Sequence, residues 1–157
     1  MAYNRKAAVE YARKWAFSRN PAFFDFSQLG GDCTNFASQC IYAGIGVMNY
    51  TPVFGWYYNS INSRSPAWTG VNELYNFLIN NRGEGPRAVE VPLSEIQAGD
   101  IVQIRFAGQN TFGHCPVVVR RGFGTPGTVL IAAHTNDAYN RALSTYMYAE
   151  LRPLHIL

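Results

Sequence analysis

The spacing of apolar residues changes near residue 88, and this change constrains the fold more than any other feature of the chain. Before it, apolar residues recur at intervals of three and four, which predicts helices over residues 4–19, 33–44 and 71–79. After it, short apolar segments separated by Gly, Pro and Asn turns predict strands at 88–91, 100–106, 115–121, 128–133 and 149–156. Helices followed by strands predict an α+β fold, with N-terminal helices packed on a C-terminal antiparallel β-sheet.

The composition fits one domain over residues 1–157. Hydrophobic residues make up 48% of the chain, enough for a single buried core, and no linker or repeat indicates a second domain. The net charge of +3 comes without a run of Lys or Arg, which argues against nucleic acid as a partner. No apolar segment reaches the length of about 18 residues that a membrane span needs, so we expect no membrane insertion, and we expect a monomer.

A cysteine at the expected first turn of the second helix is the main candidate for chemistry. Within Gly30–Gln39, two glycines permit a tight turn, Asp32 suits the N-cap, and Cys33 follows at the first helical position. The partial positive charge of a helix N-terminus lowers the pKa of a thiol, which favours a nucleophilic thiolate at Cys33. Taken alone, a cysteine is more often a small buried hydrophobe, and that interpretation suits Cys40 and Cys115.

Two of the three histidines are placed to serve such a thiol. His114 opens one predicted strand and His134 ends the next, so a hairpin would bring both to the same end of the sheet. One register puts His114 opposite His134, and a slip of one residue puts it opposite Thr135 instead. A base needs a polar group to orient it. His134 is the candidate and Asn136 the runner-up, while Asp137 would need the slipped register or a bend.

These motifs, taken in order, resemble a known family. They are Gly31–Gln39, Trp56–Tyr58, Trp68, Gly99–Val102, Gly113-His114 and His134–Asp137. Along nearly its whole length the chain resembles the bacterial putative amidase domain family, which is similar to the CHAP and NlpC-type cell-wall hydrolases. The resemblance implies a papain-like fold, in which residues 1–157 form a single cysteine amidase or peptidase domain.

The resemblance also implies roles by position. Cys33 would be the nucleophile, His114 the general base, and His134 the polar residue on the next strand that orients the base, with Asn136 as the alternative. Pro116 departs from the aliphatic residues that the family carries after this histidine. Because proline lacks a ladder donor, it predicts a bulge or an edge there.

The implied reaction is hydrolysis of an amide bond in peptidoglycan through an acyl-enzyme. The chain would be an endolysin- or autolysin-like N-acetylmuramoyl-L-alanine amidase or stem-peptide endopeptidase, without a metal or other cofactor. Trp56, Tyr57, Trp68 and Asn35 would bind the substrate, although core packing explains the aromatic residues equally well. We expect action at the bacterial cell wall. Because residues 1–157 carry no signal peptide, this implies another extracellular route, phage-type release or an excised domain.

Other functions fit the same residues. A catalytically silent wall-binding module would keep the fold without using Cys33. An acyltransferase would pass the acyl group from the same thiol to an amine instead of to water. A zinc site made of the three cysteines and the histidines is disfavoured, because their spacing lacks the paired ligands of structural zinc sites.

Overall fold

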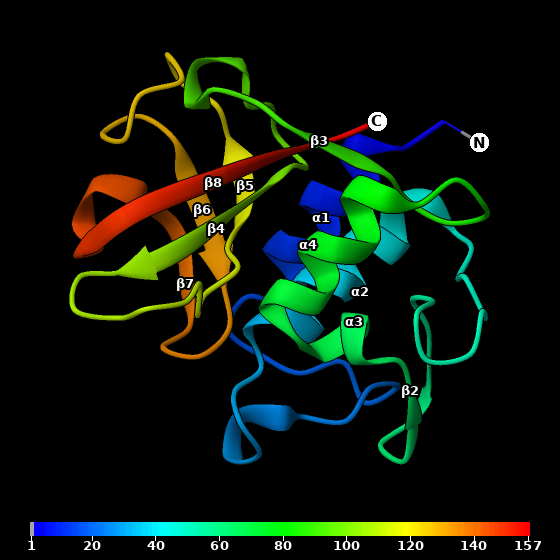
Figure 1. The fold of residues 1–157 in the computed structure, drawn as a ribbon. Coiled ribbons are helices and arrows are strands. Elements are labelled where there is room, and N and C mark those ends of the chain that lie inside the picture. The colour runs from blue at the N-terminus through cyan, green and yellow to red at the C-terminus, as the bar shows by residue number, and fades with distance from the viewer. Residues whose placement is uncertain (1) are drawn as a thin grey trace.

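Residues 2–157 are described by a computed structural model, in which helices lie on one side of an antiparallel sheet (Figure 1). The helices are α1 (Arg5–Trp15), α2 (Cys33–Ile45), α3 (Pro66–Thr69) and α4 (Val71–Asn80), with 3₁₀ turns η1 (Phe26–Gln28), η2 (Leu93–Glu95) and η3 (Leu143–Thr145). The main sheet holds β3 (Ala88–Glu90), β4 (Ile101–Phe106), β5 (Val117–Arg120), β6 (Leu130–Ala133), β7 (Ala138–Ala142) and β8 (Tyr148–Ile156). A separate hairpin pairs β1 (Tyr58–Ser60) with β2 (Ser63–Arg64). The predicted α+β architecture with an antiparallel sheet is confirmed.

The helix α1 forms because its sequence combines a cap with small residues on one face. The Asn4 side chain accepts a hydrogen bond from the Ala7 backbone N–H at 3.0 Å. Ala8 and Ala12, one turn apart, are fully buried, which allows α1 to pack closely against α2. The helix ends at Trp15, earlier than the predicted end at residue 19, so its last carbonyl groups are free to bond elsewhere.

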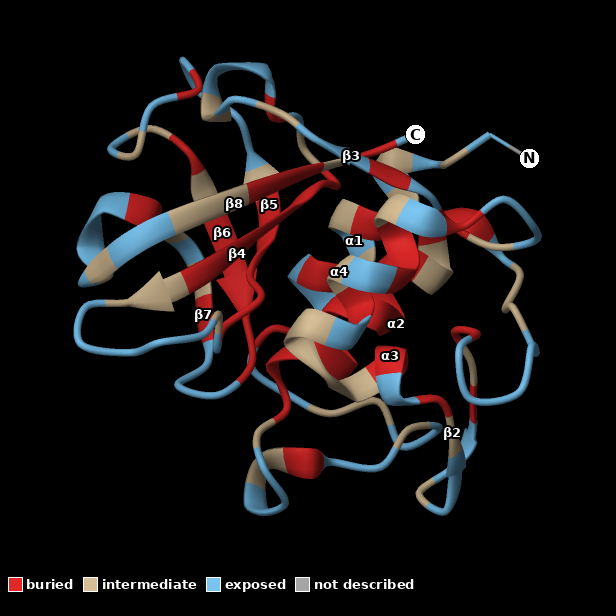
Figure 2. Cartoon of the chain, viewed as in Figure 1, coloured by how far each residue is buried: buried red, intermediate tan, exposed pale blue. Residues whose placement is uncertain are grey.

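The helix α2 is central and is buried along most of its length (Figure 2). Its polar residues therefore bond inside the protein and do not face solvent. Ser38 Oγ donates to the Trp68 carbonyl at 2.9 Å and accepts from the Trp56 indole N–H at 3.0 Å. The helix ends at Ile45 and is capped by Gly46, whose φ of +77° is left-handed and whose N–H donates to the Tyr42 carbonyl at 2.8 Å.

The strands of the main sheet follow the order β3-β8-β4-β5-β6-β7, and every neighbouring pair is antiparallel. The last strand, β8, thus lies between β3 and β4. It pairs with β4 along most of its length, from Leu154 opposite Ile101 to Tyr148 opposite Phe106. The β3, β8 and β4 strands form the most extensively paired part of the sheet.

The pairing of β5 is irregular at its start, as Pro116 predicts. Regular strand structure begins only at Val117, and His114 joins β4 through an isolated bridge to Ile104. On the other side, Val117 lies opposite Ala132 in β6. Continued along both strands, this register places His114 opposite Thr135, so the slipped register is the observed one.

The two faces of the sheet bury separate apolar clusters. The face toward the helices packs against α1, α2 and α4, and its cluster includes Cys33, Phe36, Cys40, Ile101, Cys115, Val117, Ala132 and Leu154. The opposite face is covered by the turns around η2 and η3, and its cluster includes Ile96, Val102, Ile104, Val118, Val129, Ile131 and Leu143. Within residues 2–157, no helix is both long enough and apolar enough to span a bilayer.

Candidate active site

Cys33 is the first residue of α2, as the sequence predicts. The turn before it needs two left-handed residues, which Gly30 and Gly31 supply with φ values of +87° and +103°. The Cys33 sulfur lies 3.8 Å from the Thr34 hydroxyl and receives the backbone N–H of Cys115 from the sheet. Cys33 keeps 8% of its surface exposed, whereas Cys40 and Cys115 are fully buried. It is therefore the one cysteine of residues 2–157 that a reagent can reach without unfolding the core.

The predicted lowering of the Cys33 pKa is wrong for this structure. Burial raises the pKa of the thiol, and the Asp32 carboxylate raises it further, although the Thr34 hydroxyl and the Cys115 N–H act in the opposite direction. A helix N-terminus stabilises a thiolate only partly, and here the loss of water outweighs it. The resting form of Cys33 is the neutral thiol.

His114 stands beside Cys115, on the stretch of chain that the Cys33 sulfur contacts. It is 5% exposed, and its ring centroid lies 5.9 Å from that of Phe106 and 5.4 Å from that of Tyr146. Burial, helped by the nearby Arg141 charge, lowers the pKa of His114 to about 4. The imidazole is therefore neutral at neutral pH and can accept a proton. Within residues 2–157 its ring nitrogens form no hydrogen bond to Cys33 or to another side chain.

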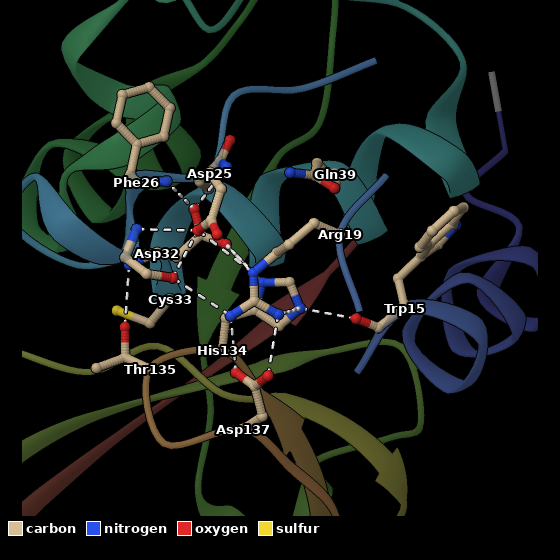
Figure 3. A network of polar contacts seen from close by, with 12 residues as sticks. Trp15, Arg19, Asp25, Phe26, Asp32, Cys33, Gln39, His134, Thr135 and Asp137 are labelled. Atoms are coloured by element: carbon tan, nitrogen blue, oxygen red, sulfur yellow. Dashed lines mark hydrogen bonds and ion pairs between the residues drawn. The ribbon is translucent and has the colours of Figure 1, made fainter. Parts of the chain in front are cut away.

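His134 does not orient His114, because both of its ring nitrogens are engaged elsewhere (Figure 3). Nε2 lies 2.7 Å from the Trp15 carbonyl, to which it can only donate, and Nδ1 lies 2.5 Å from Asp32 Oδ2. The ring stacks on Phe36 at 3.9 Å between centroids. The structure therefore gives His134 no hydrogen bond to His114, the residue that the resemblance implies it orients. His134 instead fastens the end of α1 to the start of α2.

Asp32 occupies the N-cap position of α2 but does not cap the helix with its side chain. Its Oδ1 instead accepts from the Phe26 backbone N–H at 2.7 Å and from Asn35 Nδ2 at 2.8 Å, while Oδ2 faces His134. Its own N–H donates to the Thr135 hydroxyl at 3.0 Å. The buried carboxylate is the centre of a network that fixes where Cys33 enters the helix.

Arg19 lies at the solvent-exposed side of this network. Its guanidinium donates to both oxygens of Asp137 at 3.0 Å and lies 3.3 Å from Asp25 and 3.7 Å from Asp32 (Figure 3). Asp137 thus pairs with Arg19 and not with a catalytic histidine. Asn136, the runner-up for the orienting residue, is exposed in a turn with φ +57°, and the structure does not bring it to His114.

The residues expected to bind substrate lie in the core, with one exception. Trp56 and Trp68 are fully buried, and their rings pack against each other at 4.7 Å between centroids. Asn35 is also buried and accepts the Trp68 indole N–H at 2.9 Å. These three side chains stabilise α2 and are closed off from a substrate. Tyr57 is half-buried and stacks on Tyr50 at the surface.

Two residues near His114 carry no signal in the sequence pattern. Tyr146 follows η3, and its ring contacts His114, while the Arg141 guanidinium lies 3.7 Å from the centroid of the Tyr146 ring. Arg141 lies in β7 and Tyr146 lies between η3 and β8, in a part of the chain that contains no recognisable motif. No group of three or more His, Cys, Asp or Glu side chains within the described part of the chain is arranged to hold a metal ion.

Comparison with known proteins gives a family and one curated relative. Residues 2–157 match the family model described as "Putative amidase domain". The chain is also 37% identical over 142 residues to the "Uncharacterized protein YhbB" of Bacillus subtilis strain 168, a match that covers 88% of this chain. The matched part makes up 43% of that relative, so the chain spans less than half of its length. No solved structure matches significantly.

Proposed function

Because the chain belongs to the putative amidase domain family, we propose that it hydrolyses amide bonds with Cys33 as the nucleophile and His114 as the general base. Peptidoglycan is the proposed substrate, cut either between muramic acid and L-alanine or within the peptide stem. The proposal includes a papain-like arrangement, with the thiol on a helix and the histidine on the sheet that packs against it. The family supports the amidase class, and the site geometry supports the cysteine mechanism.

One observation carries this proposal. The Cys33 thiol, at the start of α2, contacts the backbone of the residue that follows His114, and His114 is held in its neutral form. A general base must be unprotonated before the reaction, and burial ensures this for His114. The thiol and the imidazole are not hydrogen-bonded in the free protein, and catalytic hydrogen bonds commonly tighten only when substrate is bound.

Acylation begins when the Cys33 sulfur attacks the amide carbonyl carbon. The S–C bond forms as the thiol proton passes to His114, and the π electrons of the carbonyl move onto its oxygen. The backbone N–H of Cys33, unpaired within the first turn of α2, is available to the resulting oxyanion. When the carbonyl re-forms, the C–N bond breaks and His114 gives its proton to the departing amine.

Deacylation restores the thiol. Water attacks the thioester while His114 removes one of its protons, and collapse of the second tetrahedral intermediate breaks the S–C bond. The proton returns from His114 to Cys33 as the carboxylic acid leaves. Because the resting thiol is neutral, each proton movement is coupled to bond making, and no standing thiolate–imidazolium pair is needed.

The experiment that tests the proposal is digestion of purified peptidoglycan by the wild-type chain, Cys33→Ala and Cys40→Ala. We expect the wild type to release fragments with new amino groups. The summed mass of the two products of each cut should exceed the mass of the substrate by one water. Cys33→Ala should be slower by a factor of about 10³ or more. Cys40→Ala changes a buried cysteine of the same helix and should retain activity. Mass spectrometry of the new ends also identifies which amide is cut.

Each alternative has its own outcome in this experiment. Activity that persists in Cys33→Ala would overturn the cysteine mechanism. Products heavier by an amine in place of water would indicate an acyltransferase. Binding to peptidoglycan without new amino groups would indicate a silent wall-binding module.

A further inference from the structure

The Tyr146 hydroxyl is buried and donates no hydrogen bond, because the Arg141 guanidinium beside it is itself a donor and cannot accept the hydroxyl proton. Among residues 2–157, Arg19 Nε is the other buried side-chain polar atom without a hydrogen bond, and its ion pairs with Asp25 and Asp32 account for it. No such partner explains Tyr146. An unpaired buried hydroxyl destabilises the native state by an amount comparable to a lost hydrogen bond, so its presence calls for an explanation.

The neighbours of Tyr146 are the residues of the candidate site. Its ring lies against the His114 ring, at 5.4 Å between centroids and 59° between planes. The Arg141 guanidinium covers one face of the tyrosine ring, while its Nε donates to the Thr145 hydroxyl at 2.7 Å. The Tyr146 side chain is thus held between a cation and the proposed base.

The Tyr146 hydroxyl stays protonated and lies within electrostatic reach of Cys33. Burial raises the pKa of Tyr146, Arg141 lowers it through its charge and by donating to the phenol oxygen, and the negative charge of a Cys33 thiolate raises it. A protonated phenol is a hydrogen-bond donor and neither a base nor a nucleophile at neutral pH. The site therefore contains one donor that has nothing to donate to until substrate arrives.

We propose that Tyr146 is a further catalytic residue, whose hydroxyl donates a hydrogen bond to the carbonyl oxygen of the scissile amide. This inference rests on the proposed function. As the Cys33 S–C bond forms, the carbonyl π electrons move to oxygen, and the tyrosine hydrogen bond strengthens as negative charge develops there. Tyr146 keeps its proton throughout. The thiol proton goes to His114 and then to the departing amine, so the balance of the reaction is unchanged.

The test is the Tyr146→Phe variant, which removes only the hydroxyl. We expect kcat to fall by a factor of about 10² to 10³, the usual effect of losing one oxyanion donor, with KM changed by no more than about twofold. The melting temperature should change little, because the hydroxyl donates no hydrogen bond in the folded protein. Tyr148→Phe is the matched control, since Tyr148 packs on the same apolar cluster and is expected to keep full activity.

Two small reagents separate this role from a structural one. Iodoacetamide alkylates Cys33 without forming an oxyanion, so its rate should be the same in Tyr146→Phe and in the wild type. A peptide aldehyde adds to the thiol and places a developing oxyanion in the site, so its affinity should fall about as much as kcat/KM.

Each outcome decides the question. If Cys33→Ala is inactive and Tyr146→Phe is fully active, the role of Tyr146 is wrong and the proposed function stands. If Tyr146→Phe loses activity together with melting temperature and iodoacetamide reactivity, the hydroxyl is structural and the inference is wrong. If Cys33→Ala is as active as the wild type, both the proposed function and the role of Tyr146 are overturned.

Discussion

At the scale of single residues, burial decides the protonation of the candidate site. The sequence correctly places Cys33 at a helix start. The pKa of its thiol, however, depends on how far the folded protein excludes water from it, and the sequence does not reveal that burial. The same desolvation keeps His114 neutral. Nucleophile and base thus rest as an uncharged pair, and charge develops only during the reaction.

The first prediction concerns the reactivity of the Cys33 thiol. Because its pKa is raised, alkylation by iodoacetamide at pH 7 should be slower than that of a free cysteine, and the rate should rise steeply above pH 9. Mass spectrometry of the folded protein should find the label on Cys33, with Cys40 and Cys115 unmodified. A rate that is already at its plateau between pH 5 and pH 8 would instead indicate a thiolate–imidazolium pair.

The second prediction concerns His114 and acid stability. In the unfolded chain a histidine binds its proton near pH 6.5, but folded His114 binds it only near its pKa of about 4. Between these values the unfolded state carries more protons, so the free energy of unfolding falls as the pH is lowered, by about 3 kcal/mol in total.

Urea unfolding of the wild type and His114→Gln between pH 7 and pH 4 measures how much His114 contributes to this pH dependence of the free energy of unfolding. The variant should lose less stability over that range than the wild type does, by about the same 3 kcal/mol. Equal pH dependence in the two proteins would show that folding does not lower the pKa of His114.

At the scale of elements, the start of α2 is fixed by contacts between segments that lie far apart in the sequence. Asp32 and His134 are 102 residues apart, and their pairing depends on a strand register that sequence patterns leave open. The sequence supports the glycine turn and the helix start, whereas the partner of Asp32 emerges only with the fold. The Trp56–Trp68 segment shows the same limit, because polar residues of α2 draw its indoles into the core.

The strand β7 was missing from the sequence prediction for a local reason. Its segment, Ala138–Ala142, has one buried residue, and Asn140 adopts φ +55° within it, so apolar alternation is weak. An edge strand paired on one side only needs less apolar surface than an inner strand. Tyr146 follows this strand in the sequence. Without β7, the sequence pattern cannot place Tyr146, which we propose to be catalytic, beside His114.

The third prediction concerns the Asp32 carboxylate. Asp32→Asn leaves His134 buried without its charged partner, and we expect a loss of about 3 kcal/mol in the free energy of unfolding. Glu150→Gln makes the same chemical change in the partly exposed Arg105–Glu150 pair and should cost less than about 1 kcal/mol. Urea unfolding at pH 7 measures both values. Similar losses in the two variants would mean that the buried network does not stabilise α2 as described.

At the scale of the whole molecule, the N-terminal segment joins the helix layer to the sheet. The Tyr3 hydroxyl donates to the Gly99 carbonyl at 2.7 Å, and Arg5 forms an ion pair with buried Asp100 at 2.6 Å. On the helix side, the Asn4 N–H donates to the Gly44 carbonyl at 2.8 Å. Gly44 of α2 thus lies directly against the segment that precedes α1, a contact that the helical patterns alone do not indicate.

The fourth prediction follows from that contact. A Cβ at Gly44 would lie 2.4 Å from Tyr3 Cε1 and 2.8 Å from the Asn4 carbonyl oxygen, so Gly44→Ala must shift the N-terminal segment. We expect a loss of about 1–3 kcal/mol in the free energy of unfolding, despite the better helix propensity of alanine. Gly127→Ala, where nothing lies within 4 Å of the added carbon, should change it by less than about 0.5 kcal/mol. Unchanged stability in Gly44→Ala would show that the segment moves freely.

The position of β8 has a consequence for the order of assembly. β3 pairs only with β8, and β4 pairs with β8 more extensively than with β5, although β8 is synthesised after the other strands of this sheet. Until residues 148–156 have left the ribosome, β3 and β4 each present an open edge, and the long separation in sequence makes their pairing slow. During synthesis, the cysteine helix α2 is therefore complete well before the sheet on which it packs can form.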